Sequence, residues 1–232
     1  MSADERTDRI DRIDRIDRAR LLYERSVFGG DRNALPAADR ELDAVEADLA
    51  LARGRVAHAR HLRHRGAEDP EELALFERAV ELYRLLGDVR GEGEALFWVG
   101  TFHQVVRSDH ASALPALERS LELATAVEDR LTMSYALRHL GIAAHIAGRL
   151  DTARVRLEES VRLRRELGFL PGVAANLVGL AYIAAGQDRR DDALALVEEA
   201  AAIVAATGAD GILPSVEEAR RDLAGDDLPR PL

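Results

Sequence analysis

The sequence predicts an all-α fold, a solenoid of stacked antiparallel helical hairpins. Three six-residue segments can be laid over one another without a gap, namely 95–100 (ALFWVG), 136–141 (ALRHLG) and 176–181 (NLVGLA), offset by 41 and 40 residues. A second segment recurs at 76–80, 117–121, 157–161 and 197–201. A sustained period of this length is typical of stacked hairpins, each of which buries its apolar face only against its neighbours.

The N-terminal segment, 1–36, is highly charged and is expected to be helical. It carries the triplet Asp-Arg-Ile three times, which places aspartates four residues before arginines and so supports a helix. Ile10, Ile13 and Ile16 form a narrow apolar stripe. Either this stripe packs against the first hairpin of its own chain, or it packs on a second copy and forms a homodimer. A solvated, partly disordered tail is the third interpretation.

Residues 37–208 are expected to hold about four hairpins, the first of them degenerate. A long helix over 37–65 supplies the first A helix, and Asp69 followed by Pro70 starts the first B helix, which ends at Gly87. The later A helices are expected over about 91–107, 131–148 and 171–186, and the later B helices over about 112–127, 152–167 and 192–207. Residues 209–232 are expected to form a capping helix, over about 216–224, and a tail.

Glycine recurs where the B helices end, at Gly87, Gly168 and Gly208. A left-handed residue commonly ends a helix, and glycine adopts that conformation without steric cost. Glu128 occupies this place in the second copy, so we expect that turn to differ.

Small residues recur at fixed places in both kinds of helix. They are Gly100, Gly141 and Ala181 in the A helices, and Ala79, Ser120, Ser160 and Ala200 in the B helices. The string Leu140-Gly141, Gly148, Ala153, Leu157 and Ser160 resembles the tetratricopeptide-repeat signature, and residues 178–186 resemble it again. The resemblance covers about 50–208, with helices about one turn longer than the usual 34-residue repeat allows. It implies a right-handed superhelix with a concave groove lined mainly by A helices, and it implies no enzymatic activity.

If this geometry holds, a stripe of A-helix side chains faces the groove. Its members are Glu94, Phe97, Trp98, Thr101, Gln104, Tyr135, Arg138, His139, Ile142, His145, Val178 and Tyr182. The stripe holds the only Trp and two of the four Tyr, a concentration that favours a binding groove. The alternative is that Phe97, Trp98 and Ile142 simply fill the space between adjacent helices.

The resemblance does not extend to the peptide-carboxylate clamp of the family. That clamp needs Asn and basic residues at set groove positions, which here hold Phe97, Thr101 and His139. Arg138 alone keeps a suitable charge, and an arginine in a groove can still bind a carboxylate or phosphate through two hydrogen bonds.

Two further basic clusters are interpreted as solvated surface. His58, His61 and His64 step by three beside several arginines, and Arg154, Arg156, Arg162, Arg164 and Arg165 crowd one B helix without aromatic neighbours. A metal site is not expected, because His103, His139 and His145 lack the four-residue spacing that would join two ligands on one helix.

Composition excludes several classes of function. The chain has no Cys, which excludes a thiolate nucleophile, and no Lys, which excludes a phosphate-loop lysine. A net charge of −10 argues against binding to nucleic acid or to anionic membranes. The N-terminus has no apolar stretch of signal-peptide length, and the longest apolar-rich stretch, 173–185, is too short to span a bilayer, so a soluble cytoplasmic protein is expected. No cofactor is expected.

Two hypotheses from different classes remain open. The first is a non-catalytic adaptor that binds a protein or peptide segment in its concave groove. The second is a regulatory protein that senses a small molecule, or assists a biosynthetic enzyme, through a pocket in the same groove.

Overall fold

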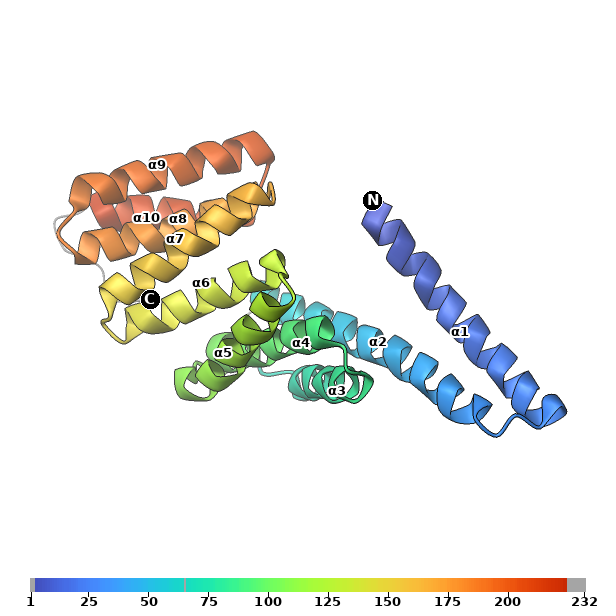
Figure 1. Ribbon diagram of the computed structural model, residues 1–232. Helices are drawn as coiled ribbons and strands as arrows, with labels where there is room; N and C mark the ends of the chain where they lie inside the picture. The colour runs from blue at the N-terminus through green and yellow to red at the C-terminus, as the bar shows by residue number, and fades with distance from the viewer. Residues whose placement is uncertain (1–2, 65, 225–232) are drawn as a thin grey trace.

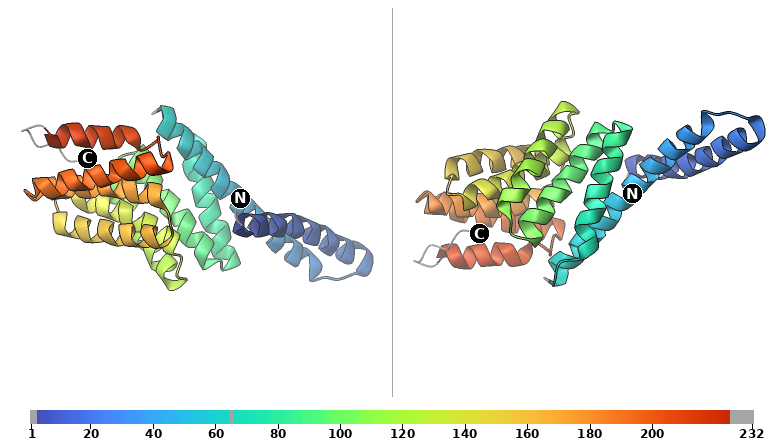
Figure 2. Two further views of the ribbon diagram at one scale, coloured as in Figure 1. Left: turned by 90° about the horizontal axis from the view of Figure 1, so that it is seen from above. Right: turned by 90° about the horizontal axis from the view of Figure 1, so that it is seen from below.

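The described part of the chain consists of helices and loops, and the helices follow one another as antiparallel pairs. The computed structural model describes residues 3–64 and 66–224, with the backbone alone for 3–13. The helices are α1 (Ala3–Gly29), α2 (Ala34–His64), α3 (Pro70–Leu86), α4 (Val89–Thr101), η1 (Phe102–Val106), α5 (His110–Ala126), α6 (Arg130–Ile146), α7 (Leu150–Glu166), α8 (Leu170–Gly186), α9 (Arg190–Thr207) and α10 (Leu213–Ala224). Consecutive helices pack along the whole series (Figure 1, Figure 2), which confirms the all-α solenoid.

Small residues let the two helices of a hairpin approach closely. A Cβ atom added at Gly100 in α4 would lie 2.6 Å from Cγ of Leu117, a fully buried side chain of α5. Gly54 in α2 has the same role, because a Cβ there would overlap the ring of Phe76 in α3. The second half of α2 therefore works as the first A helix.

The N-terminal hairpin projects from the solenoid (Figure 1, Figure 2). Its first helix, α1, runs antiparallel to the first half of α2 and packs on it through Ala19 and the half-buried Leu22. Arg15 and Arg18 both form ion pairs with Glu41 of α2. Thus the N-terminal segment packs on its own chain. The side chains of Ile10 and Ile13 lie outside the described residues, and Ile16 is 52% exposed.

One extra residue in the second A helix is absorbed by a π-helix. Asp109, the residue that precedes the B helix α5, lies nine positions after the small residue Gly100. In the next hairpin, Arg149 precedes the B helix α7 and lies only eight positions after Gly141. The π-helix η1 lies within the longer path, and π-helical turns of this kind accommodate single insertions and are frequent at functional sites. The 41-residue offset in the sequence is the trace of this insertion.

The turn at Glu128 does not differ from its counterparts, contrary to expectation. Glu128 adopts φ 55°, next to φ 73°, 68° and 66° at Gly87, Gly168 and Gly208. The hairpin geometry therefore imposes the left-handed conformation on a residue with a Cβ, at a cost of roughly 1–2 kcal/mol.

Replacing Glu128 by glycine is expected to raise the free energy of unfolding by about 0.5–1 kcal/mol. The gain is smaller than the relieved strain because glycine also loses more backbone entropy on folding. Urea unfolding followed by circular dichroism measures it, with Gly168→Glu as the reverse control that should destabilise. Equal stability of Glu128→Gly and the parent chain would contradict the argument.

The C-terminal end of the solenoid is covered by α10. Val216, Ala219 and Leu223 are buried against α8 and α9. The helix begins at Leu213, a few residues before the expected start, and residues 225–232 lie outside the described part of the chain. None of the described helices is long and apolar enough to cross a lipid bilayer.

Candidate functional site

A pocket opens on the side of the solenoid formed by the A helices. It has a volume of about 600 Å³, within the range of ligand-binding pockets. Eight residues of the expected groove stripe line it, together with further residues of α2, η1, the loop after η1, the start of α5 and the end of α6. The complete lining is His58, Leu62, Phe97, Trp98, Thr101, Gln104, Val105, Ser108, His110, Tyr135, Arg138, His139, Ile142 and Ile146.

Aromatic rings in edge and tilted contacts form one wall of the pocket. The centroid of Phe97 lies 5.1 Å from that of Trp98 and 5.3 Å from that of Tyr135. Trp98 in turn stacks on the buried ring of Phe76, at 5.6 Å between centroids. Because each of these rings packs against side chains of at least one other helix, the wall is preformed rather than assembled by a ligand. The aromatics therefore both fill the space between helices and line the pocket.

Arg138 brings a positive charge to the pocket. Its Nη1 donates to the carbonyl of Ala175 and to Oδ1 of Asn176, each at 2.8 Å. Burial lowers the pKa of Arg138 to about 10, so the group remains charged at neutral pH. No Asp or Glu is among the residues that line the pocket. The pocket is thus positive in a chain whose net charge is −10.

A second guanidinium lies beneath the same wall, because Arg164 is buried rather than solvated as expected. Arg164 is 1% exposed, and its Nη1 donates to Asn176 Oδ1 at 3.0 Å and to the carbonyl of Gly172 at 2.7 Å. Its guanidinium carbon lies 4.8 Å from the centre of the Tyr135 ring, a cation–π contact. Burial and the nearby Arg138 lower the pKa of Arg164 to about 10. Two arginines therefore converge on one neutral amide oxygen.

His139 is held neutral and in one tautomer. Burial, with Arg138 and Arg164 nearby, lowers the pKa of His139 to about 3. Gln104 Nε2 donates to the carbonyl of His139, which orients the amide so that its Oε1 accepts from His139 Nδ1 at 2.6 Å. The proton therefore sits on Nδ1, and Nε2 is left as a hydrogen-bond acceptor.

His58 is buried in a pair with Glu72, which corrects the expectation of a solvated face. His58 is 5% exposed and Glu72 is fully buried, with 2.8 Å between His58 Nδ1 and Glu72 Oε1. Burial raises the pKa of Glu72 to about 7 and lowers the pKa of His58 to about 4. Between about pH 4 and about 7 the pair is therefore neutral, with the proton on the carboxyl group, and it adds no charge to the pocket.

Replacing Glu72 by glutamine is expected to change how stability depends on pH. The folded pKa of Glu72 is raised, so its contribution to stability is present below pH 4.5 and is lost as pH rises through about 7. Glutamine has no such loss. The unfolding free energy of Glu72→Gln minus that of the parent chain should therefore increase between pH 4.5 and about 7, by about 3 kcal/mol, and then level off. Denaturation curves across this pH range test it, and a difference independent of pH would refute it.

Four residues of the expected stripe lie outside the pocket, and one of them, Val178, is buried in the hydrophobic core. Glu94 forms an ion pair with Arg55 of α2 in a separate, more polar hollow. His145 is half-buried at the end of α6, and burial lowers its pKa. The hydroxyl of Tyr182 donates to Asp222 of α10 at 2.9 Å, so the capping helix accounts for this side chain.

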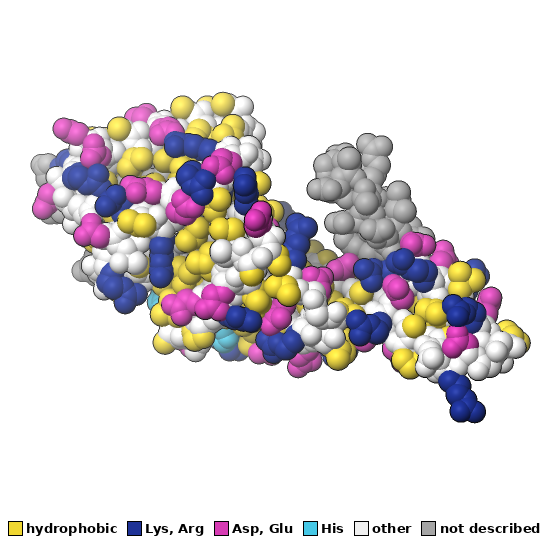
Figure 3. Space-filling model, viewed as in Figure 1, with side chains coloured by type: hydrophobic (Ala, Val, Ile, Leu, Met, Phe, Trp, Pro, Cys, Tyr) yellow, Lys and Arg dark blue, Asp and Glu magenta, His cyan; other side chains and the backbone are white. Residues whose placement is uncertain are grey.

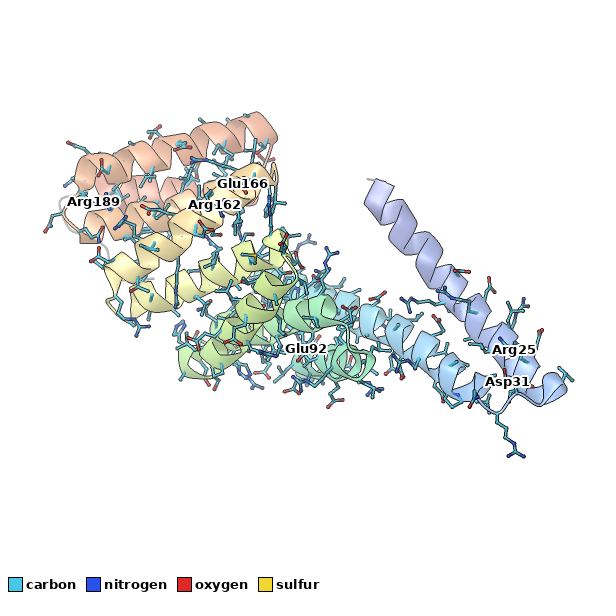
Figure 4. The ribbon with its side chains drawn as sticks, viewed as in Figure 1. Arg25, Asp31, Glu92, Arg162, Glu166 and Arg189 are labelled. Atoms are coloured by element: carbon cyan, nitrogen blue, oxygen red, sulfur yellow. The ribbon has the colours of Figure 1, made fainter. Side chains whose placement is uncertain are left out.

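A hollow of similar size between α7 and α9 differs in its electrostatics. Its volume is about 630 Å³, and Figure 3 shows apolar side chains there bordered by basic and acidic ones. Arg162 pairs with Glu159 and Glu166, and Arg189 pairs with Asp192 (Figure 4). Since these charges neutralise each other on the surface, we interpret this hollow as the solvent-exposed faces of α7 and α9 and not as a ligand site. The pocket at Arg138, by contrast, holds a charge that no carboxylate neutralises among the residues that line it.

Sequence reasoning missed Glu72, Arg164 and Asn176, although the repeat contains their signal. Glu72 stands where the other copies have alanine, at Ala113, Ala153 and Ala193. Arg164 stands where they have Tyr83, Ala124 and Val204, and Asn176 where they have Ala95 and Ala136. All of these counterparts are buried. A polar residue at a position that is apolar in every other copy thus marks a buried polar group.

The described residues contain no group of three or more His, Asp or Glu that could hold a metal ion.

Residues 92–166 match the family model of the tetratricopeptide repeat. The match runs from the first turn of α4 to the end of α7, and so includes η1 and α6 with their pocket residues. No curated protein matches the chain.

Proposed function

We propose that this chain is a non-catalytic adaptor that binds a partner's segment in its groove. Residues 92–166 match the model of the tetratricopeptide-repeat family, whose members generally bind proteins. The observation that carries the proposal is the pocket among α2, α4 and α6. It combines a preformed aromatic wall with an arginine that lacks a carboxylate partner in the lining. The partner segment inserts an apolar or aromatic side chain there.

The charge of the pocket defines the second feature of the segment. Arg138 is charged at neutral pH, whereas His139 and His58 are neutral. Moreover, Arg164 adds positive potential from below the wall. A carboxylate on the segment, next to the inserted side chain, neutralises this potential. His139 Nε2 accepts a hydrogen bond from the same segment.

Selection from a random peptide display library tests the proposal. We expect enriched peptides that combine an aromatic or large aliphatic residue with Asp or Glu within a few positions. Leu62 lies at the rim of the pocket and is 55% exposed, so Leu62→Glu leaves the fold intact and adds a repulsive charge. This variant should weaken binding of the selected peptides at least tenfold.

Val155→Glu is the matched control for Leu62→Glu. Val155 lies on α7, outside the pocket, and is 57% exposed, so this substitution makes the same charge change at similar exposure. Peptides that bind both variants and the parent chain equally would show that the pocket is not the site. Failure to recover any peptide above background would count against peptide binding altogether.

A small molecule is the second candidate ligand, favoured by the size of the pocket. About 600 Å³ accommodates a compact aromatic anion, and most of the lining is apolar. Thermal-shift screening with aromatic carboxylates addresses this candidate. A ligand at 100 times its Kd stabilises the folded chain by about 2.7 kcal/mol. A shift that Leu62→Glu removes, together with an empty peptide selection, would favour the small molecule.

A further inference from the structure

The projecting hairpin of α1 and α2 carries an apolar stripe that the described residues leave uncovered. Leu35, Leu42, Leu49 and Val56 follow one another at intervals of seven along α2. Each is between 46% and 50% exposed. An apolar residue every seven positions is the pattern of a helix that packs along a second helix at a shallow angle. The helices on which α2 chiefly packs, α1 and α3, use other faces of it, where Ala34, Ala38, Ala47 and Leu51 are buried.

The exposed apolar residues of α1 extend the same face. At 100° per residue, Ile16, Tyr23 and Val27 lie about a quarter turn from the Ala19 and Leu22 face that packs on α2. The Leu35 and Leu42 stripe lies about a quarter turn from the face of α2 that packs on α1. For two right-handed antiparallel helices, these rotations bring both sets to one side of the hairpin. Arg18, which pairs with Glu41, marks the opposite side. The three α1 residues are each more than half exposed.

We propose that this face is a dimer interface, on which the same hairpin of a second copy packs to form an antiparallel four-helix bundle. A two-fold axis parallel to the helices places α1 of one copy beside α2 of the other, so that all four neighbouring helix pairs are antiparallel. Such bundles bury apolar positions of this spacing along their common axis. This proposal is independent of the ligand pocket.

Charge supports a second copy as the occupant of the face. Arg15 and Arg18 pair with Glu41, which fixes the register of α1 on α2. In that register Arg20 lies at the level of Asp39, on the outer edges of the face. Neither side chain forms an ion pair with any other residue in the described part of the chain. The two-fold axis brings Arg20 of each copy next to Asp39 of the other, so opposite charges of the two copies face each other at both edges of the interface.

The area of the face is sufficient for a stable dimer. The overlap of α1 with residues 34–56 of α2 is about 33 Å long and about 20 Å wide, given 1.5 Å per residue and two helix diameters. Two such faces bury about 1,300 Å² in total, within the range of specific interfaces. The hairpin projects from the solenoid in all three ribbon views (Figure 1, Figure 2), so most of its length extends beyond the solenoid body.

Light scattering coupled to size exclusion, on the full chain of 25.4 kDa, tests the proposal. We expect the mass of two copies for the parent chain and for Leu21→Glu, since Leu21 is 52% exposed on the other flank of α1. Leu42→Glu should give the mass of one copy, with unchanged helical circular dichroism. A monomeric parent chain at its highest soluble concentration would overturn the proposal, and so would equal behaviour of the two glutamate variants.

A charge exchange tests the arrangement within the dimer. Arg20→Asp and Asp39→Arg should each raise the dissociation constant of the dimer at least threefold, because each places like charges across the interface. The double variant should restore the parent value. If the double variant dissociates more than either single variant, the pairing of α1 with the other copy's α2 is wrong.

Discussion

Replacing Asn176 by leucine is expected to lower the free energy of unfolding by about 3–5 kcal/mol. Asn176 is fully buried in α8, and its Oδ1 accepts from both Arg138 and Arg164 while its Nδ2 donates to Ser160 Oγ at 2.7 Å. Leucine fills the volume but accepts no hydrogen bond. Two charged guanidinium groups then lose an acceptor in a site from which water is excluded. Urea unfolding followed by circular dichroism gives the measurement.

Asn176→Asp is the matched control, because it keeps the shape and the acceptors. An aspartate accepts from both arginines and adds an ion pair with each, but it cannot donate to Ser160. We therefore expect a loss smaller than that of Asn176→Leu by at least 2 kcal/mol, in line with the net value of hydrogen bonds to charged groups. Equal stability of the leucine variant and the parent chain would mean that the two arginines do not depend on this amide.

Replacing Gly100 by alanine is expected to destabilise the chain by about 1–3 kcal/mol, although alanine is the better helix former. The new Cβ would lie 2.6 Å from Cγ and 2.8 Å from Cδ2 of Leu117, and 3.2 Å from the carbonyl oxygen of Ala113. Leu117 is fully buried and Ala113 contributes backbone, so neither can yield without separating α4 from α5. Denaturant unfolding of the purified variant measures the loss.

Gly179→Ala provides the contrast for Gly100→Ala. Gly179 lies in the middle of α8, and a Cβ there would lie 3.6 Å from Leu157, an ordinary van der Waals contact. Alanine should therefore stabilise the helix by up to about 1 kcal/mol. The two glycine substitutions should thus have opposite signs. The same sign for both would show that close approach of α4 and α5 does not determine the need for glycine.

The positions of the helices could be predicted from sequence because the repeat supplies several independent signals for each. Small residues mark the crossings of A and B helices, and glycines mark the turns, so Gly100, Gly141 and Gly168 alone locate most of the hairpins. The expected difference at Glu128 was wrong because the packing of two helices on each other fixes the turn. The free energy gained by packing the two helices exceeds the cost of placing one residue with a Cβ in the left-handed conformation.

The groove was predictable in part. Phe97, Trp98 and Tyr135 come together because adjacent A helices present them to the same groove, although Tyr135 stands at the repeat position of Glu94. Tyr182 stands at the repeat position of Thr101 and Ile142, which line the pocket, but in α8 the capping helix α10 supplies Asp222 as its partner. The sequence position of α10 does not reveal which face of α8 it touches.

The buried polar groups could not be predicted from residue type. Arg164 lies among other arginines on α7, and arginine is rarely buried unless it is paired, so a solvated face was the reasonable expectation. Its partners, Gly172 and Asn176, come from the next helix, and only the stacking of α7 on α8 brings them within hydrogen-bond distance. Similarly, His58 meets Glu72 across a hairpin whose loop departs from the repeat.

The most direct test of the proposed site uses Trp98, because it is the only tryptophan in the chain and lines the pocket. Titrating the parent chain with a peptide recovered by selection should change the Trp98 emission in a saturable way, and Leu62→Glu should raise the fitted Kd at least tenfold, while Val155→Glu leaves it unchanged. A peptide that binds with saturation by calorimetry, yet leaves the Trp98 emission unchanged and binds Leu62→Glu as tightly as the parent chain, would show that the partner docks elsewhere.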